Sequence, residues 1–402
     1  MTRSRNAPPE VPADSDSTPI AAGPDTAVAG TARPVPQLQM HLRFQPSAAF
    51  LGILGELNEQ FPDWSDGSYD WANQTVDFLH GAEAVPSFDT ALYQTPLSRR
   101  ALNDVLQLGL ALLSGHYSVV RQYLQDDHFL FVVGYPRSGG SYLTKELLRG
   151  IGLEHTRVSE ALAHDGFPEI RSHWYGPGHA GKPYFHLQDS VFQVAEFLVI
   201  AHLYYRRKAS ALLSGQWVIP KKMHKLVYWA GSLKMLLGQG AADYLVTIRH
   251  PIPTAISIYE KCGGLPTDGY FPAQPRSAIE RWVYDDLIWL GHADQDIAHM
   301  DYFQAVTQSW TAFYLQMASS GIFVGPHAEE VSLLPYGQER LEGVIHHYRQ
   351  QQGSARTVEP FLTHDKAQSV APEAVAQGDA AVAAVQAAWQ ALGLSFPDLS
   401  LN

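Results

Sequence analysis

The sequence predicts an α/β fold in which a central, mostly parallel sheet is flanked by helices in three layers, with a helical extension before it. Short apolar runs that fit buried strands alternate with longer stretches whose apolar residues are spaced three and four apart. Strands that alternate with helices favour a parallel sheet covered on both faces. The expected strands are Phe129–Val133, His155–Ser159, Gln216–Ile219, Asp243–Ile248 and Val331–Leu334.

The composition excludes several classes of protein. The chain has 402 residues and a formal charge of −12, so a nucleic-acid-binding surface is not expected. Its single cysteine, Cys262, allows no internal disulfide and offers no metal-site spacing, which fits a reducing cytoplasm. The first residues lack the apolar core of a signal peptide, and no run approaches the ~20 apolar residues of a membrane span.

Three regions follow one another along the chain. Residues 1–37 are rich in Pro, Ala, Ser, Thr and Asp, and we expect a disordered tail because they offer little apolar surface to bury. Residues 38–127 form the helical extension or cap, and residues 128–402 form the α/β domain. Helical spacing in the extension covers Ala48–Leu57, Trp71–Leu79 and Ser98–Leu124.

The remaining elements of the α/β domain are mostly helices. Residues 164–188 are rich in Gly, Pro, His and aromatic residues, which indicates either a binding loop or a packed surface loop. Polar, loop-like sequence covers 351–378. The expected helices are 141–151, Val191–Arg207, Ser232–Leu237, one opening at Pro253, a pair within 277–318, 337–347 and Ala380–Leu392.

The first strand of the domain leads through a glycine-rich turn into a helix, as in a P-loop. Gly134 and Gly139 have the G-x-x-x-x-G spacing, and Ser141 takes the place of the Mg²⁺-binding hydroxyl. Backbone N–H groups of such a turn and the dipole of the helix hold an anion. The P-loop lysine is missing, since Gly140 takes its place, and the cation of the turn is Arg137. ATP chemistry is therefore disfavoured.

Two other short stretches carry suitable chemistry. Arg249 follows a strand, where open α/β sheets bind ligands, and Ser257 lies on the helix that returns past it, so both could hold a second phosphate. Lys222 and His224 follow another strand and share a face if the segment is extended. A cation beside a base suits transfer of an anionic group. The expected source of positive charge is a basic cluster of Arg206, Arg207, Lys208, Lys221, Lys222 and Lys225.

These pieces together resemble the cytosolic-type sulfotransferase family, in a divergent bacterial-style form, over roughly residues 125–350. The resemblance implies the donor 3′-phosphoadenosine 5′-phosphosulfate (PAPS) and no metal. It assigns the 5′-phosphosulfate to a Tyr-Pro-Lys-Ser-Gly-like loop and the 3′-phosphate to an Arg and a Ser eight residues later. It assigns the adenine to a stacking ring, here Tyr142 in place of a Trp, and to a tyrosine at its edge, here Tyr336. The matching residues are Tyr135, Pro136, Arg137, Ser138, Gly139, Gly140, Ser141, Tyr142, Arg249, Ser257 and Tyr336.

The resemblance also implies direct in-line transfer of the sulfuryl group. His224 would be the general base, while Lys222 and Arg137 would stabilise the departing phosphate. Glu160 is a rival base, because some Golgi-type sulfotransferases use a glutamate in this region. The late Arg-Lys-Gly motif of the family has no counterpart; only Lys366 keeps a cation there.

The acceptor is expected to be a hydroxyl or amine of a small molecule, a natural product or a carrier-bound chain. Aromatic residues within 164–188 and 282–314 suggest an apolar or aryl pocket for it, although such residues also build ordinary cores. Two alternatives stay open: a P-loop kinase that acts on a small molecule, and a non-catalytic binding relative of the fold.

Overall fold

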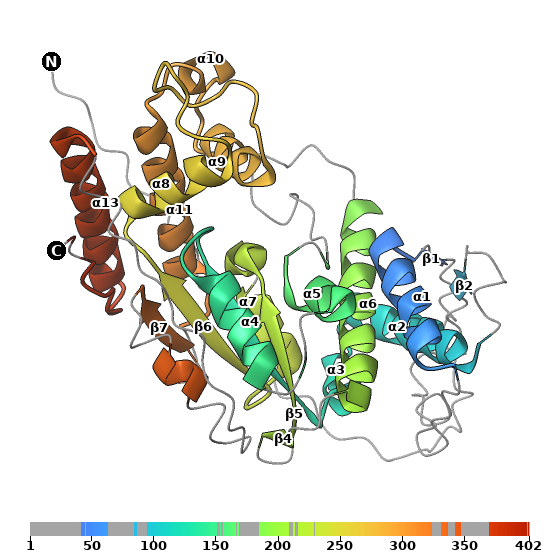
Figure 1. Cartoon of the computed structure of the whole chain (residues 1–402). Coiled ribbons are helices and arrows are strands. Elements are labelled where there is room, and N and C mark those ends of the chain that lie inside the picture. The colour runs from blue at the N-terminus through green and yellow to red at the C-terminus, as the bar shows by residue number, and fades with distance from the viewer. Residues whose placement is uncertain are drawn as a thin grey trace, which may run out of the picture.

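The computed structural model places the chain in the arrangement shown in Figure 1. The tail predicted for 1–37, the helix expected at Trp71–Leu79, most of 164–188 and Lys366 lie outside the described residues. The structure describes residues 42–44, 46–62, 84–86, 95–150, 153, 156–165, 167–168, 185–208, 212–213, 216–228, 230–323, 331–336, 342–346, 370–399 and 401.

A central sheet organises the domain, and its order is β4-β5-β3-β6-β7. The four long strands β3, β5, β6 and β7 run parallel, while the two-residue β4 pairs antiparallel with β5 at one edge. The predicted α/β class is thereby confirmed. The strands are β3 (Asp127–Gly134), β4 (Leu212–Leu213), β5 (Gln216–Lys222), β6 (Ala242–Ile248) and β7 (Val331–Pro335).

The order of the strands reverses at β3. The chain leaves β3 for β5 on one side and later returns to β6 on the other side. Ligands of open α/β sheets bind beside such a switch point, at the carboxyl ends of the strands. The parallel register sets Gly134 beside Thr247 and Val132 beside Lys222, so the turn after β3 adjoins the ends of both neighbours.

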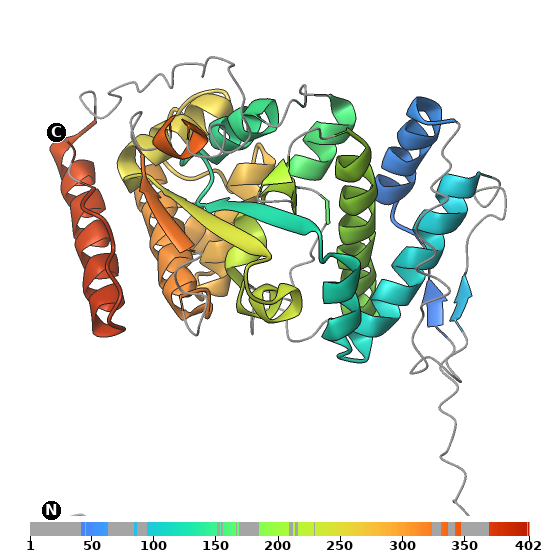
Figure 2. The same cartoon turned by 90° about the horizontal axis from the view of Figure 1, so that it is seen from below.

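Helices cover both faces of the sheet. Figure 2 shows α4 on one face and α7 and α11 on the other, with α13 beyond the β7 side. The helices among the described residues of the domain are α4 (Gly140–Gly150), α5 (Arg157–Ala163), α6 (Phe185–Lys208), η6 (His224–Tyr228), α7 (Ala230–Leu237), α8 (Pro251–Lys261), α9 (Ala278–Trp289), α10 (Asp294–Ile297), α11 (Tyr302–Ser319), a short stretch at 342–346 and α13 (Pro372–Ala391).

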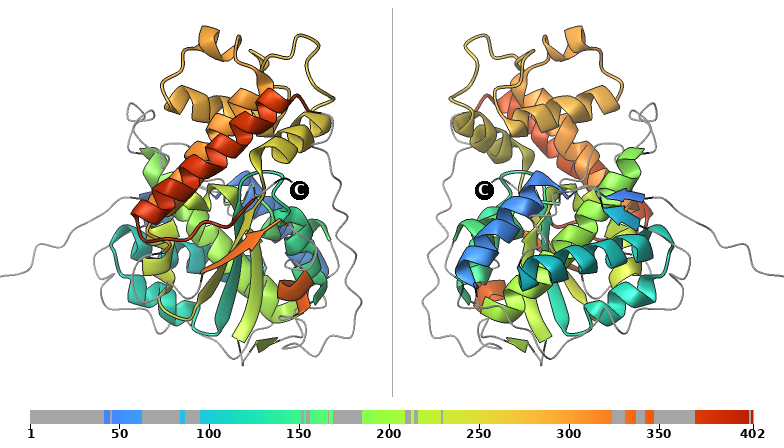
Figure 3. Two further views of the ribbon diagram at one scale, coloured as in Figure 1. Left: turned by 90° about the vertical axis from the view of Figure 1, so that its left-hand side faces the viewer. Right: turned by 90° about the vertical axis from the view of Figure 1, so that its right-hand side faces the viewer.

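The helical extension stacks on the side of α6 that is turned away from the sheet (Figure 3). The helix expected over Ser98–Leu124 is two helices, because Gly115 adopts φ 75° and turns the chain between them. The extension also holds a parallel pair of three-residue strands that the sequence did not predict. Its elements are β1 (Leu42–Phe44), α1 (Ala48–Gln60), β2 (Ala84–Pro86), α2 (Pro96–Leu113) and α3 (Tyr117–Tyr123).

A buried carboxylate fixes α1 to α6. Glu196 accepts hydrogen bonds from the backbone N–H of Ser47, at 2.8 Å, and from its hydroxyl, at 2.6 Å. Ser47 also caps α1 by accepting from Phe50 N. Burial raises the pKa of Glu196 to about 7.

Two local predictions were wrong. The strand expected at His155–Ser159 is instead the beginning of α5, because Thr156 and Ser159 form a reciprocal capping box. The loop expected to end at residue 378 ends earlier, since Pro372 opens α13 at its first turn.

The helix α13 packs on α8 and α11. A Cβ at Gly378 would lie 2.6 Å from Ile252 Cγ1 and 2.8 Å from His250 Cε1, so no side chain fits between α13 and the start of α8. His250 Nε2 donates to Asp379 at 3.1 Å, which ties the helices together beside Arg249.

Two residues of the expected basic cluster, Arg206 and Lys222, lie at opposite ends of the sheet. Arg206 pairs with Asp126, just before β3, whereas Lys222 lies at the opposite, carboxyl end of β5. The segment that separates these basic residues runs the length of the sheet, so their closeness in sequence does not bring their charges together. None of the described helices is long and apolar enough to cross a membrane.

Candidate active site

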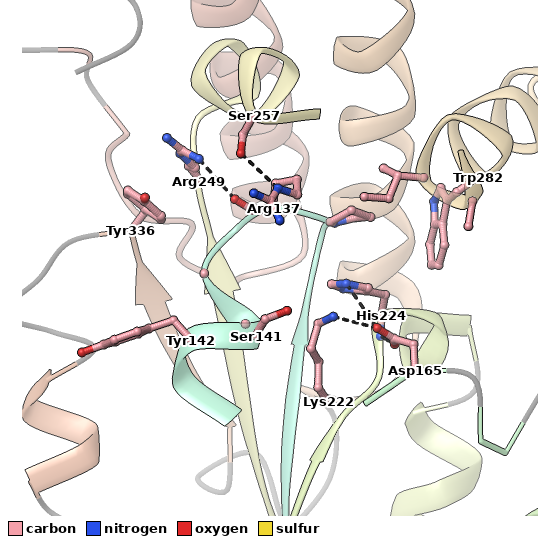
Figure 4. A pocket seen from close by; sticks show the side chains of 15 residues that line it. Arg137, Ser141, Tyr142, Asp165, Lys222, His224, Arg249, Ser257, Trp282 and Tyr336 are labelled. Carbon is pink, nitrogen blue, oxygen red and sulfur yellow. Dashed lines mark hydrogen bonds and ion pairs between the residues drawn. The ribbon is translucent and has the colours of Figure 1, made fainter. Parts of the chain in front are cut away.

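A cavity of about 600 Å³ opens at the carboxyl ends of β3, β5 and β6 (Figure 4). All the predicted site residues line it except Tyr135, Ser138 and Glu160. The lining residues are Pro136, Arg137, Gly139, Gly140, Ser141, Tyr142, Asp165, Lys222, His224, Arg249, Ser257, Ala278, Ile279, Trp282 and Tyr336.

The turn between β3 and α4 is shaped to hold an anion. Gly134 is packed so closely that a Cβ there would lie 2.5 Å from the carbonyl oxygen of Thr247. Arg137 and Gly139 both adopt positive φ, 70° and 97°, and Arg137 is the only non-glycine residue of the described chain that does so. Such backbone turns aim N–H groups at one point. The first turn of α4, which starts at Gly140, adds the positive end of its dipole.

Two predicted ligand residues of this turn point into the protein instead. Ser138 is buried, and its hydroxyl pairs with that of Thr247 at 2.7 Å. Tyr135 is also buried, and its hydroxyl donates to Ser309 Oγ at 2.8 Å. Both side chains therefore fix the turn, which leaves the backbone, Arg137 and Ser141 to face the cavity.

The two predicted phosphate sites adjoin each other. The Nε of Arg137 donates to Ser257 Oγ at 3.0 Å, and Arg249 Nη1 donates to the carbonyl of Arg137 at 3.3 Å. Two guanidinium groups and a hydroxyl thus meet at one end of the cavity (Figure 4). Since the protein carries a formal charge of −12, such a local gathering of cations marks a place for an anion.

Arg249 has a buried hydrogen-bond donor, its Nε, that is available to a ligand. Its side chain is only 5% exposed, and within the described residues its Nε has no hydrogen-bond partner. A buried donor without a partner costs about 1–3 kcal/mol, more for a charged group, so a ligand oxygen would relieve this cost. The guanidinium carbon Cζ lies 4.1 Å from the ring centre of Tyr336, so a cation–π contact helps to hold it in place.

The tyrosines predicted to contact adenine lie on one side of the loop. Tyr142, on α4, and Tyr336, after β7, both line the cavity on the side away from His224 (Figure 4). Their rings offer apolar faces to a planar base.

At the other end of the cavity, Lys222 and His224 lie side by side with a carboxylate that the sequence analysis missed. Asp165 Oδ2 accepts from Lys222 Nζ at 2.8 Å, and Oδ1 accepts from the backbone N–H of His224 at 2.8 Å. The Nε2 of His224 is 3.4 Å from Asp165 Oδ2. The nearest atom of Lys222 to a Cβ at Gly140 is its Cε, at 3.6 Å, so Lys222 lies beside the place of the missing P-loop lysine.

The protonation states suit a base at this position. Burial lowers the pKa of His224 to about 4, Asp165 opposes this effect and Lys222 adds to it, so His224 is neutral at pH 7. Burial alone raises the pKa of Asp165, but His224 and Lys222 outweigh it and hold that pKa well below its usual range. The carboxylate is therefore ionised.

The rival base Glu160 does not face the cavity. It is an exposed residue of α5, and Asp165 occupies the position near His224 five residues later. No spacing pattern in the sequence singled out Asp165, because it lies in a turn outside any strand or helix.

The wall opposite His224 is apolar and comes from α9. Ala278, Ile279 and Trp282 line it, and the rings of Trp282 and His224 meet edge to face with centres 6.0 Å apart. The indole N–H donates to Asp286 at 2.9 Å, Asp286 accepts from Ser309 at 2.6 Å, and Ser309 accepts from Tyr135. This chain of hydrogen bonds links Trp282 on α9 to Tyr135 in the turn between β3 and α4. The aromatic segment at 282–314 thus contributes to the cavity.

Within the part of the chain that the structure describes, no group of three or more His, Cys, Asp or Glu side chains could hold a metal ion.

The chain matches no protein-family model, no curated protein and no solved structure. Its function is therefore inferred from the residues of the cavity.

Proposed function

We propose that the protein is a sulfotransferase that moves a sulfuryl group from PAPS to a hydroxyl or amine of a small-molecule, natural-product or carrier-bound acceptor. The observation that carries this proposal is the contact between the loop cation and the second phosphate-type site. Arg137, Ser257 and Arg249 share hydrogen bonds at one end of a cavity whose other end holds Lys222 and His224.

The geometry supports a ligand with two anionic groups of one nucleotide. The backbone turn around Arg137 suits the 5′-phosphosulfate, while Arg249 and Ser257 suit the 3′-phosphate. Tyr142 and Tyr336 would contact the adenine on the side of the cavity away from His224. A nucleotide without a 3′-phosphate would leave the buried Nε of Arg249 without a partner among the described residues, which gives a physical reason for selecting PAPS.

The transfer step would use residues that already face one another. His224 would take the proton of the acceptor, which as general base contributes about 10²–10⁴-fold. Lys222, beside Gly140, would stabilise the charge that develops on the leaving phosphate. The acceptor would lie between His224 and Trp282, because an apolar wall faces the base there.

A P-loop kinase fits the cavity less well. Its loop lysine would extend from position 140, and Gly140 provides none. The Lys222 side chain that lies near this position comes from β5 and not from the loop, so the loop itself has no lysine to follow the terminal phosphates of ATP.

A thermal-shift assay separates these candidates. We expect stabilisation by 3′,5′-ADP, the product nucleotide, with about 2.7 kcal/mol at one hundred times its Kd, and none by ATP with Mg²⁺. The reverse result would favour the kinase. Transfer from ³⁵S-labelled PAPS to a panel of phenols, aliphatic alcohols and amines then tests catalysis, and binding of 3′,5′-ADP without transfer to any of them would favour a non-catalytic relative.

A further inference from the structure

The carboxylate of Asp165 contacts Lys222 and His224, the two residues that carry the proposed transfer step. Asp165 itself has no role in that step as described so far. One oxygen accepts from Lys222 Nζ and the other from the backbone N–H of His224, both at 2.8 Å. Its side chain is 34% exposed and lines the cavity, so it faces the space that the proposed substrates would occupy (Figure 4). A residue that only stabilised the fold would not need to face this space.

A second lysine of β5, Lys221, holds the turn that carries Asp165 through hydrogen bonds to its backbone. Lys221 is fully buried, and its ammonium donates to the carbonyls of Leu162, at 2.8 Å, His164, at 2.6 Å, and Phe167. These three carbonyls enclose position 165 in sequence. Neighbouring residues of a strand point to opposite faces, so Lys221 holds the turn while Lys222 enters the cavity.

Hydrogen bonding fixes the tautomer of His224. Its Nδ1 contacts the carbonyl oxygen of Gly134, which can only accept, so Nδ1 carries the proton. The lone pair of Nε2 then faces the cavity, with Asp165 Oδ2 at 3.4 Å. Two acceptors at this distance repel each other, and a proton on Nε2 turns that repulsion into attraction.

We infer that Asp165 is a positioning residue that orients Lys222 and His224 and accepts the hydrogen bond of the imidazolium formed during transfer. In this step the acceptor O–H bond breaks and the Nε2–H bond forms. The acceptor oxygen forms the new bond to sulfur, and the bond from sulfur to the phosphate oxygen breaks, with its electron pair leaving on 3′,5′-ADP. The inference rests on the proposed function for the identity of this reaction, whereas the pairing of Asp165 with His224 stands on geometry alone.

Several other groups around His224 contribute to its charge state. Lys222 from β5 and His164 from the Asp165 turn lower the pKa of His224, while the Gly134 carbonyl from β3 raises it. Trp282 from α9 adds a neutral ring edge. Among these groups Asp165 is the only anion. Removal of its charge should therefore lower the pKa of His224.

Histidine NMR tests the pairing without any need for turnover. In protein labelled with ¹⁵N-histidine, His224→Gln identifies the signal of His224 among the 18 histidines. In the unmodified protein we expect the shifts of a neutral ring protonated at Nδ1. Asp165→Asn keeps the shape of the side chain and removes its charge, and we expect it to lower the pKa of His224 by about one unit. Asp296→Asn, on the exposed helix α10, is the matched control and should change nothing.

Kinetics and nucleotide binding complete the test. Asp165→Asn should bind 3′,5′-ADP at least as tightly as the unmodified protein, because it removes a negative charge beside Lys222. Its turnover should fall about tenfold, with the acid limb of the pH profile shifted to lower pH. An unchanged pKa of His224 in Asp165→Asn, or a ring protonated at Nε2 in the unmodified protein, would overturn the inference. If the unmodified protein does not bind 3′,5′-ADP at all, the proposed function is refuted instead. The NMR result would still decide whether Asp165 pairs with His224.

Discussion

Replacement of Arg249 by methionine should separate the two phosphate sites by experiment. Methionine keeps an unbranched apolar stem against the ring of Tyr336 but removes the guanidinium, whose Nε is buried without a partner in the described residues. Only a nucleotide with a 3′-phosphate would use that group. The variant should therefore lose affinity for 3′,5′-ADP and keep its affinity for 5′-AMP.

The size of the loss follows from the contacts available. A hydrogen bond to a charged group contributes about 1.5–3 kcal/mol, which corresponds to roughly 10- to 150-fold in Kd. The single bond from Arg249 to the carbonyl of Arg137 is long, at 3.3 Å, so its loss should disturb the loop little. The difference between the two nucleotides, measured for the same variant, cancels any general damage to the loop.

Isothermal titration of both nucleotides is the appropriate assay. Arg281→Met is a matched control, because Arg281 is an exposed residue of α9 that also lies over a tyrosine ring and is not part of the cavity. An equal loss for 3′,5′-ADP and 5′-AMP, or no loss for either, would refute the assignment of Arg249 to a 3′-phosphate.

Three further predictions concern the base, the fold and the loop. His224→Ala should reduce sulfuryl transfer by at least about 10²-fold while titration shows unchanged 3′,5′-ADP binding; retained transfer would exclude it as the base. Glu196→Gln should remove a pH dependence of stability. Burial raises the pKa of Glu196 from 4.5 to about 7, so the unmodified protein should lose roughly 3 kcal/mol as the pH rises through this window, whereas the variant should not. Urea unfolding at pH 5 and pH 8 measures this, and parallel losses in both proteins would contradict it. Gly134→Ala should cost about 1–3 kcal/mol and abolish nucleotide binding, because the new Cβ would meet the carbonyl of Thr247, whereas Gly55→Ala, with open space around it, should be neutral or stabilising in thermal denaturation; equal effects would disprove the packing argument.

The long strands of the sheet and most helices could be predicted from the sequence, because buried parallel strands are continuous apolar runs. The errors occurred where one or two residues decided the local structure. Thr156 and Ser159 cap a helix in a segment that otherwise resembles a strand, and Gly115 divides one apolar periodicity into two helices. The small paired strands of the extension escaped prediction because each has only three residues.

The candidate site was predictable where its residues follow strand ends in sequence. Arg137, Lys222 and Arg249 each come directly at or after a strand, and parallel strands bring these ends to one edge. Asp165 was missed because the turn that carries it is held by hydrogen bonds from Lys221 to three backbone carbonyls, which no local pattern records. The inward direction of Ser138 was missed for the same reason: Thr247, its partner, belongs to another strand.

Gly378 connects the helix α13 to the proposed nucleotide site, although no residue of that helix lines the cavity. Any larger side chain there would act as a wedge against His250 and Ile252 and tilt the beginning of α8, the helix that carries Ser257. A random-mutagenesis screen for weakened 3′,5′-ADP binding should therefore recover substitutions at this remote glycine, and second-site suppressors should trim the side chain of Ile252.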